Sequence, residues 1–132
     1  ARPAAEQQKQ GRAFPAVGVL LMQKAYRIRK NSQFRYVYRK GKGSGRRTMS
    51  LTYVRAGRLQ AGFSISKMVG KAVERNLIKR RMRECFRLQM HTLKPGFYVF
   101  TAKPAAAQAD YRALQRDMDA LIDRMQLRKL QP

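Results

Sequence analysis

The sequence predicts one domain of the α/β class, built from three helices and three strands. Segments with alternating apolar and polar residues, typical of strands, lie between segments whose apolar residues recur at every third or fourth position, typical of helices. The chain has 132 residues, of which 44% are hydrophobic. This length and composition suffice for one domain with a modest hydrophobic core.

The chain divides into a short extension and a folded domain. Residues 1–21 show no hydrophobic periodicity and mix Ala, Gln, Pro and Arg, so we expect a disordered N-terminal extension. Residues 22–130 form the predicted domain, and Met22 is a candidate for its first residue.

The first helix is predicted to begin at Asn31 or Ser32, either of which can cap it, and to end at Gly41. One side of this helix carries Phe34, Val37 and Tyr38. The glycine-rich stretch GKGSGRR follows at 41–47. It lacks the G-x-x-x-x-G-K-[ST] spacing of a phosphate-binding loop and comes after a helix instead of before one. We therefore expect a mobile basic loop.

Two strands are predicted after this loop. The first, TMSLTYV at 48–54, has on one face Met49, Leu51 and Tyr53. The second, LQAGFSIS at 59–66, has on one face Leu59, Ala61, Phe63 and Ile65. Because only the short turn AGR separates the two runs, we expect them to pair as a β-hairpin.

A long helix and a third strand are predicted next. The helix is expected from about Ala72 to about Met90, before Pro95 and Gly96 break the pattern. The strand FYVFTA at 97–102 is almost wholly apolar, which indicates a buried position in the sheet.

The last predicted helix follows an Ala-rich linker and is capped by Asp110. Its helically spaced apolar residues form an ordinary core-facing stripe of Tyr111, Leu114, Met118, Leu121, Ile122 and Met125. This helix also holds four of the seven acidic residues, namely Asp110, Asp117, Asp119 and Asp123. It is therefore a poor face for binding a nucleic acid.

The composition indicates a polyanionic partner. Thirty Lys and Arg residues stand against seven Asp and Glu residues, a net charge of +23 that needs neutralising. Nucleic acid fits this demand better than a membrane surface, which would need an amphipathic helix with a free apolar face. No apolar run reaches the roughly 18 to 20 residues of a membrane span, so we expect a cytoplasmic protein. The single cysteine, Cys85, is expected to be a small core residue.

The stretch VERNLIKRRMRE at 73–84 concentrates five cations on the long helix. At about 100° per residue, an arc of roughly 140° holds Arg75, Asn76, Lys79, Arg80, Arg83 and Arg87. An adjoining arc, expected to face the core, holds Ile78, Met82, Cys85 and Phe86. A solvated helix face is the common alternative. We call the first arc the cationic strip. Glu74 and Glu84 are too few to neutralise its charges, and like charges one turn apart destabilise a helix. We therefore favour the interpretation that the strip binds a polyanionic ligand.

These residues also resemble a known family. The stretch GFSISKMVGKAVERNLIKRRMRECFR at 62–87 is similar to the signature of the protein subunit of bacterial ribonuclease P, approximately K-x-V-G-x-A-V-x-R-N-R-I-K-R-x-x-R. The resemblance extends from about Lys24 to about Leu127 and keeps the family's order of elements. One departure is Leu77, which stands where the family usually has the second Arg of R-N-R.

The resemblance implies a fold similar to the second domain of ribosomal protein S5, with a central sheet flanked by helices and a left-handed βαβ crossover. It also implies the function of an accessory subunit, inactive alone, with one protein bound to one catalytic ribonuclease P RNA. The holoenzyme would remove the 5′ leader of precursor tRNA with Mg²⁺ held mainly by the RNA. No catalytic residue and no metal ligand are expected in the protein.

The helical strip and the resemblance together predict contacts to the catalytic RNA by Lys67, Lys71, Arg75, Asn76, Lys79, Arg80, Arg83 and Arg87. The resemblance further implies a cleft for the leader of precursor tRNA, formed by Phe34, Tyr38 and Thr52. An aromatic face there can stack an unpaired base. The alternative for the two aromatic residues is simple core packing. Thr52 stands where some relatives carry a tyrosine, which weakens the stacking expected at that position.

Other function classes remain to be weighed against this one. No paired carboxylates, Ser/His/Asp set or metal-ligand cluster indicates an independent enzyme, and the lone His91 has no obvious partner. A structural RNA-binding protein of the ribosomal type suits the composition equally well. Non-specific DNA compaction fits the charge but does not require Asn76 or the aromatic helix.

Overall fold

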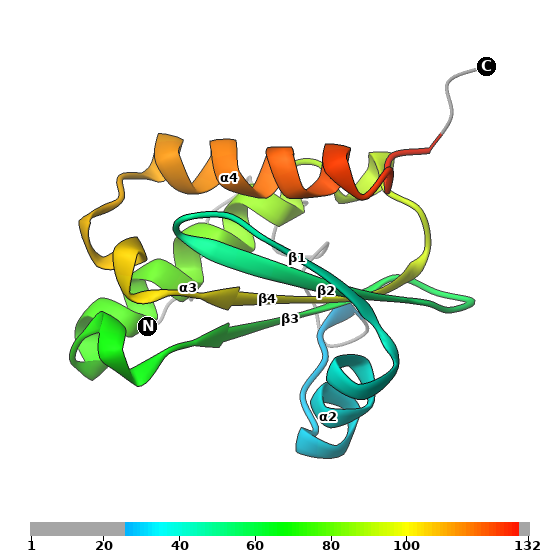
Figure 1. Cartoon of the computed structure of the whole chain (residues 1–132), viewed down its shortest axis with the longest axis horizontal. Coiled ribbons are helices and arrows are strands. Elements are labelled where there is room, and N and C mark those ends of the chain that lie inside the picture. The colour runs from blue at the N-terminus through cyan, green and yellow to red at the C-terminus, as the bar shows by residue number, and fades with distance from the viewer. Residues whose placement is uncertain (1–25, 130–132) are drawn as a thin grey trace, which may run out of the picture.

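A computed structural model describes residues 26–129, and these contain three α-helices and one four-stranded sheet (Figure 1). In chain order the elements are α2 Asn31–Lys40, β1 Lys42–Gly45, β2 Met49–Arg55, β3 Gln60–Ile65, α3 Ala72–Arg87, β4 Gly96–Ala102 and α4 Tyr111–Arg124. The predicted α/β class is confirmed. The predicted N-terminal extension, 1–21, and Met22 lie outside the described residues.

The strand order is β1-β2-β4-β3, so the predicted hairpin between β2 and β3 is wrong. β4 lies between these two strands, antiparallel to β2 and parallel to β3. The cause is the apolar character of β4, which buries Tyr98, Val99 and Phe100 by taking a central place in the sheet. The parallel pair β3 and β4 is connected through α3, so this helix is the crossover of a βαβ unit.

The glycine-rich stretch is not a loop, which corrects the sequence prediction. Lys42–Gly45 is a strand that pairs antiparallel with β2 along its whole length. Glycine and lysine are depleted in strands, so the local sequence favoured a loop. Pairing with the strongly β-forming β2 overrides that preference and places β1 at the edge of the sheet.

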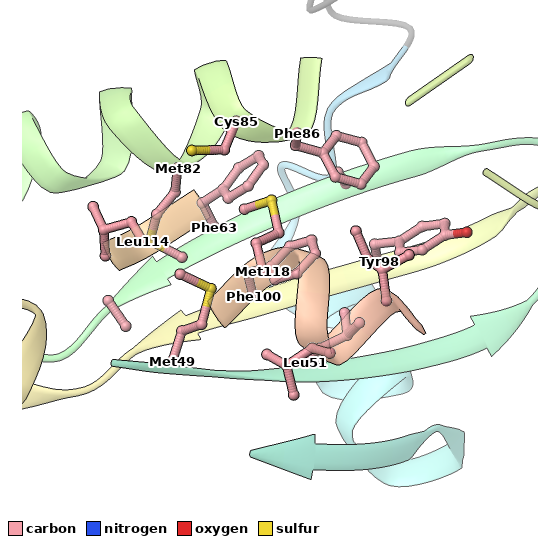
Figure 2. Close-up of a cluster of buried hydrophobic side chains, with 14 of the residues drawn as sticks. Met49, Leu51, Phe63, Met82, Cys85, Phe86, Tyr98, Phe100, Leu114 and Met118 are labelled. Carbon is pink, nitrogen blue, oxygen red and sulfur yellow. The ribbon is translucent and has the colours of Figure 1, made fainter. Parts of the chain in front are cut away.

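The two faces of the sheet are covered by different helices (Figure 1). α3 and α4 pack on one face, where the buried side chains of Met49, Leu51, Phe63, Tyr98 and Phe100 meet those of the two helices (Figure 2). The ring of Phe86 from α3 lies 5.4 Å from that of Tyr98 and 5.6 Å from that of Phe100, between centroids. On the other face α2 buries Val37 against Val99.

The helix ends follow the sequence prediction in part. Asp110 caps α4 as predicted, because its carboxylate accepts the N–H of Ala113 at 2.8 Å. The predicted caps of α2 are wrong, since Lys30 occupies the capping position and makes no side-chain bond there. α3 ends at Arg87, and a turn of 3₁₀-helix follows at Met90–Thr92.

Among residues 26–129, no helix combines the length and apolar character needed to span a bilayer.

Candidate RNA-binding surface

α3 presents an apolar face to the core and a cationic face beside it, as the helical periodicity predicted. Ile78, Met82, Cys85 and Phe86 are all buried. On the adjoining arc Asn76 and Arg80 are exposed. The other four side chains of the arc are half-buried, namely Arg75, Lys79, Arg83 and Arg87. Half-burial lets the aliphatic stems pack on the protein while the charged ends stay available to a ligand.

A pocket of about 230 Å³ lies between α2 and α3, and we call it the cationic pocket. It forms where the segment before α2 runs beside β3, held by the Ile28 N–H, which donates to the Ala61 carbonyl at 2.9 Å. Side chains and backbone from four parts of the chain line it, including Arg27, Arg29, Phe34, Gly62, Lys79 and Arg83. The pocket therefore brings two predicted RNA contacts beside a predicted leader contact.

The cationic pocket has an unbalanced positive charge, because no Asp or Glu lines it. Partial burial, and then the charges of Arg83 and Arg27, lower the pKa of Lys79. Partial burial, and then the charges of Arg27 and Arg80, lower the pKa of Arg83. Each cation is thus held where its charged form is disfavoured, and an anion would remove that penalty.

Two donors of the cationic pocket also lack acceptors. The Nε atoms of Arg27 and Arg83 are buried and have no hydrogen-bond partner. An unsatisfied buried donor costs about 1 to 3 kcal/mol, so such groups are rare in folded proteins. Phosphate oxygens accept hydrogen bonds from guanidinium groups, so a phosphodiester would satisfy both the charge and the donors.

The two acidic residues near the strip already have hydrogen-bond partners, the backbone of Lys71 for Glu74 and the side chain of Arg87 for Glu84. Glu74 accepts the Lys71 N–H at 2.7 Å and so caps α3. Glu84 accepts hydrogen bonds from Arg87, one of them at 3.0 Å. Arg87 therefore has an intrahelical partner, whereas Lys79 and Arg83 appear in none of the ion pairs of the described residues.

Phe34 is both a core residue and a wall of the cationic pocket. Its ring packs with Ile28, Val37 and Val99 and lies directly over Gly62, where an added Cβ would be 2.6 Å from the ring. The absence of a side chain at Gly62 is what lets the ring approach the sheet this closely. Core packing, one of the two interpretations that the sequence allowed for Phe34, is confirmed, and a contact with the leader stays a prediction.

The other two residues predicted for the leader cleft lie on the same face of the sheet as α2 but outside the cationic pocket. Tyr38 is 46% exposed, and its hydroxyl is 2.9 Å from Oγ1 of Thr101 on β4. Thr52 is half-buried beside the end of α2, near Gly41. Lys67 and Lys71 are exposed in the turns that lead into α3.

Sequence reasoning missed Arg27 and Arg29. They lie in RIRK at 27–30, a dense run of cations immediately before α2, and this density was the signal available. The run has no helical or strand periodicity, so nothing in it indicated which side chains would reach α3.

The described residues hold no group of three His, Cys, Asp or Glu side chains that could bind a metal ion. His91 is exposed after α3, and Cys85 is buried as predicted. Burial raises the pKa of the Cys85 thiol to about 11, so it is not activated as a nucleophile.

Comparisons with known proteins identify the family of this chain. The family model described as Ribonuclease P matches residues 22–126. The ribonuclease P protein component of Caldanaerobacter subterraneus subsp. tengcongensis is 35% identical over 111 residues, covering 81% of this chain and 95% of the relative. That of Chloroflexus aurantiacus is 40% identical over 105 residues, covering 76% and 78%. The structure of the RNase P protein of Staphylococcus aureus matches with a TM-score of 0.75 and 28% identity, covering 80% of this chain and 100% of the other.

Proposed function

This chain belongs to the family of ribonuclease P protein components, whose place in a ribonucleoprotein implies an RNA partner, and we propose that it binds both the catalytic RNA and the 5′ leader of precursor tRNA. The observation that carries the proposal is the cationic pocket. It holds Lys79 and Arg83 of the signature helix beside Phe34, with two buried guanidinium donors that lack acceptors.

The catalytic RNA is proposed to lie along the outer side of α3. Phosphates would be contacted by Arg75, Lys79, Arg80 and Arg83, with Lys67 and Lys71 on the same backbone near the start of the helix. Asn76 is exposed and supplies a neutral hydrogen-bonding group on the same arc. Arg87 is proposed as a peripheral contact, because Glu84 already neutralises it.

The leader is proposed to cross the face of the sheet that α2 covers. Phe34 offers the edge of a fixed ring, and Tyr38 offers a ring and a hydroxyl tied to Thr101. Thr52 lies on this face but has no aromatic surface for a base. Stacking on one aromatic ring is worth about 1 to 3 kcal/mol per base, which is enough to hold an unpaired leader in register.

Catalysis is proposed to reside in the RNA, with Mg²⁺ held mainly by RNA phosphates. The acidic residues in the described part of the chain already cap a helix or accept hydrogen bonds from other side chains and backbone groups, as do Asp110, Asp117 and Asp123. The protein would supply positive charge that lets two RNA molecules approach each other. One protein per RNA is the proposed stoichiometry.

Reconstitution tests this proposal. The chain is mixed with a bacterial ribonuclease P RNA and a precursor tRNA at low Mg²⁺, and release of the 5′ leader is measured. We expect cleavage that neither the protein nor the RNA gives alone under these conditions. Absence of any stimulation would contradict the proposal and favour a structural RNA-binding protein of the ribosomal type.

A single substitution tests the contact surface. Arg83→Ala should weaken binding to the catalytic RNA and reduce the slope of log affinity against log salt by about one unit. Arg112→Ala is the matched control, because Arg112 is exposed on α4, away from the cationic pocket. A slope for Arg83→Ala equal to that of the control would remove Arg83 from the contact surface.

A further inference from the structure

A second pocket lies at the end of the sheet where β2 ends and β4 begins, and we call it the Tyr53 pocket. Its volume is about 560 Å³, within the range of ligand-binding pockets. β3 leads into α3 at the opposite end of the sheet (Figure 1). Lys67 and Lys71 lie between β3 and α3, and so at the end of the sheet away from this pocket. None of the residues assigned above to RNA or leader lines it.

The lining of the Tyr53 pocket combines cations with an apolar floor. Three positively charged side chains from three different segments line it, those of Lys42, Arg55 and Lys94. Met125 and Leu127, at the end of α4, supply the apolar part. No acidic residue lines the pocket, so its charge is unbalanced, as in the cationic pocket.

Tyr53 is the one aromatic side chain of this lining, and it is held rigidly. Its hydroxyl donates to the Pro95 carbonyl at 2.5 Å, and its ring meets Tyr98 edge-on with centroids 4.9 Å apart. Gly96 lies against the ring, where any added Cβ would overlap it, and the φ of +150° at Gly96 also excludes other residues. A ring fixed in this way offers a stacking surface at little entropic cost.

The rim of the pocket contains an unusual backbone. Gln126 has a φ of +58° and is the one described non-glycine residue with positive φ. It ends α4, because its own N–H and that of Leu127 donate to the carbonyls of Asp123 and Ile122. Glycine is the usual residue in this position. With Gln126 there, an amide able to donate and accept hydrogen bonds lies at the rim beside the cations.

We propose that the Tyr53 pocket binds one unpaired nucleotide of a single-stranded RNA segment, with its base against Tyr53 and its flanking phosphates on Arg55, Lys94 and Lys42. This rests on the proposed function, which supplies the RNA partner. An aromatic face next to cations is the usual arrangement for single-stranded nucleic acid. The chain's own residues 1–25 are a poor occupant, because they carry four Lys and Arg against one Glu. A second copy, at +23, is repelled for the same reason.

Titration of the whole protein with a five-nucleotide uridine RNA, followed by amide NMR, tests the site directly. We expect the amide signals of Arg55, Gly96 and Gln126 to shift with one common affinity. Lys94→Glu should weaken that affinity at least ten-fold, whereas Arg112→Glu, on the outer side of α4, should change it by less than three-fold. Shifts confined to α3 and α2 would overturn the inference and leave the proposed function standing.

Substitutions of the ring separate base stacking from simple charge attraction. Tyr53→Phe should retain the affinity of the pocket, because the ring remains. Tyr53→Leu should lower it five-fold or more, the equivalent of about 1 kcal/mol or more of stacking. An acidic peptide of five Glu residues serves as the competing ligand. If the peptide shifts the same signals as strongly as the RNA, and Tyr53→Leu affects neither, the pocket is only a basic surface and the inference fails.

Gln126→Gly adds a variant that leaves the pocket folded. Glycine adopts positive φ without a steric penalty, so thermal stability should not fall. If the amide contacts the nucleotide, the affinity for the uridine RNA should drop about three-fold or more. Unchanged affinities for Gln126→Gly, Lys94→Glu and Tyr53→Leu would together overturn the inference.

Discussion

Lys79 and Arg83 lie one helical turn apart on α3, and both are close enough to Arg27 for the charges to disfavour one another. The free protein therefore carries an internal repulsion, which the bound RNA would relieve. Such a cluster of like charges lowers the stability of the free protein, and the same charges would raise its affinity for RNA. Stability and binding should respond in opposite directions to the loss of one of these charges.

Lys79→Met tests this opposition, because methionine keeps the unbranched apolar stem and removes the charge. We expect the free energy of unfolding of the free protein to rise by about 0.5 kcal/mol, since like charges at i and i+4 destabilise helices by that order. Affinity for the catalytic RNA should fall, with a salt slope smaller by about one unit. Urea unfolding and RNA binding measure the two effects. A less stable variant would show that the Lys79 charge has a partner within the protein.

Asp117 illustrates the other kind of charged residue, one that holds the fold together. Its carboxylate accepts the Thr48 N–H at 3.1 Å and the Thr48 hydroxyl at 2.6 Å, and it pairs with Arg46 at 3.3 Å. Burial alone would raise the pKa of Asp117, but these bonds outweigh burial and lower the pKa from its ordinary value. The carboxylate thus fastens the turn between β1 and β2 to α4.

The pH dependence of stability follows from that shift. Because the folded pKa lies below the unfolded one, the stabilisation is present above about pH 4 and is lost as the pH falls through the folded pKa. Asp117→Asn should cost about 1 to 2 kcal/mol at pH 7, and this difference should shrink below pH 4. Urea unfolding of both proteins at several pH values measures it. An equal difference at all pH values would mean that the ionised form is not what stabilises the turn.

At the scale of elements, the junction between α2 and β1 places the aromatic helix over the sheet. Gly41 ends α2, with its N–H donating to the Val37 carbonyl at 2.7 Å. An added Cβ there would lie 2.6 Å from the Val37 carbonyl oxygen and 2.8 Å from that of Tyr53. Neither backbone atom can move without shifting the helix or the strand. Gly41 therefore controls how closely α2 approaches the sheet.

Gly41→Ala should accordingly destabilise the protein by about 1 to 3 kcal/mol, as overpacking generally does. Gly57→Ala is the matched control, because a Cβ at Gly57 would meet nothing within 4 Å. Thermal unfolding of the two variants compares them directly. Equal melting temperatures would show that the junction has room that the structure does not contain.

The sequence predicted most elements but not their pairing. Periodicity identified the buried arc of α3 and the stripe of α4, because each depends only on spacing within one helix. The hairpin prediction failed because the alternation of apolar and polar residues in β2 and β3 does not specify which strand each one pairs with. β4, some 30 residues later in the chain, pairs with both of them. The strand Lys42–Gly45 was missed because its pairing, and not its composition, makes it a strand.

In the candidate site, too, the sequence predicted what depends on one helix and not what depends on contacts between distant segments. Positions within α3 were predictable from the helical repeat, whereas the convergence of Arg27 with Lys79 and Arg83 is a tertiary contact between segments about 50 residues apart. The resemblance to a family identified Phe34, Tyr38 and Thr52 as candidates. Only the structure separates Phe34, which lines the cationic pocket, from Tyr38 and Thr52, which do not.

The whole molecule carries +23 charges, and its described ion pairs involve only a few of its cations. Salt screens repulsion between exposed charges within a Debye length of about 10 Å at 0.1 M. Salt also weakens RNA binding, because releasing condensed counterions into more concentrated salt gains less free energy. The same ions should therefore stabilise the free protein and destabilise its complex.

Raising NaCl from 0.05 to 0.5 M tests this. We expect the melting temperature of the free protein to rise by several degrees, while its affinity for the catalytic RNA falls by more than ten-fold. Thermal unfolding and filter binding under the same buffers make the comparison. A melting temperature that falls with salt would mean that attractive pairs dominate the surface.

The place of β4 in the sheet has a consequence for synthesis on the ribosome. The strand that joins the two halves of the sheet is the last to be translated, so β2 and β3 emerge from the exit tunnel with open edges. α3 also emerges before β4, the strand that pairs with both β2 and β3. The nascent chain thus exposes α3 before the sheet beneath that helix is complete, and the domain can fold no earlier than when residue 102 has left the ribosomal tunnel.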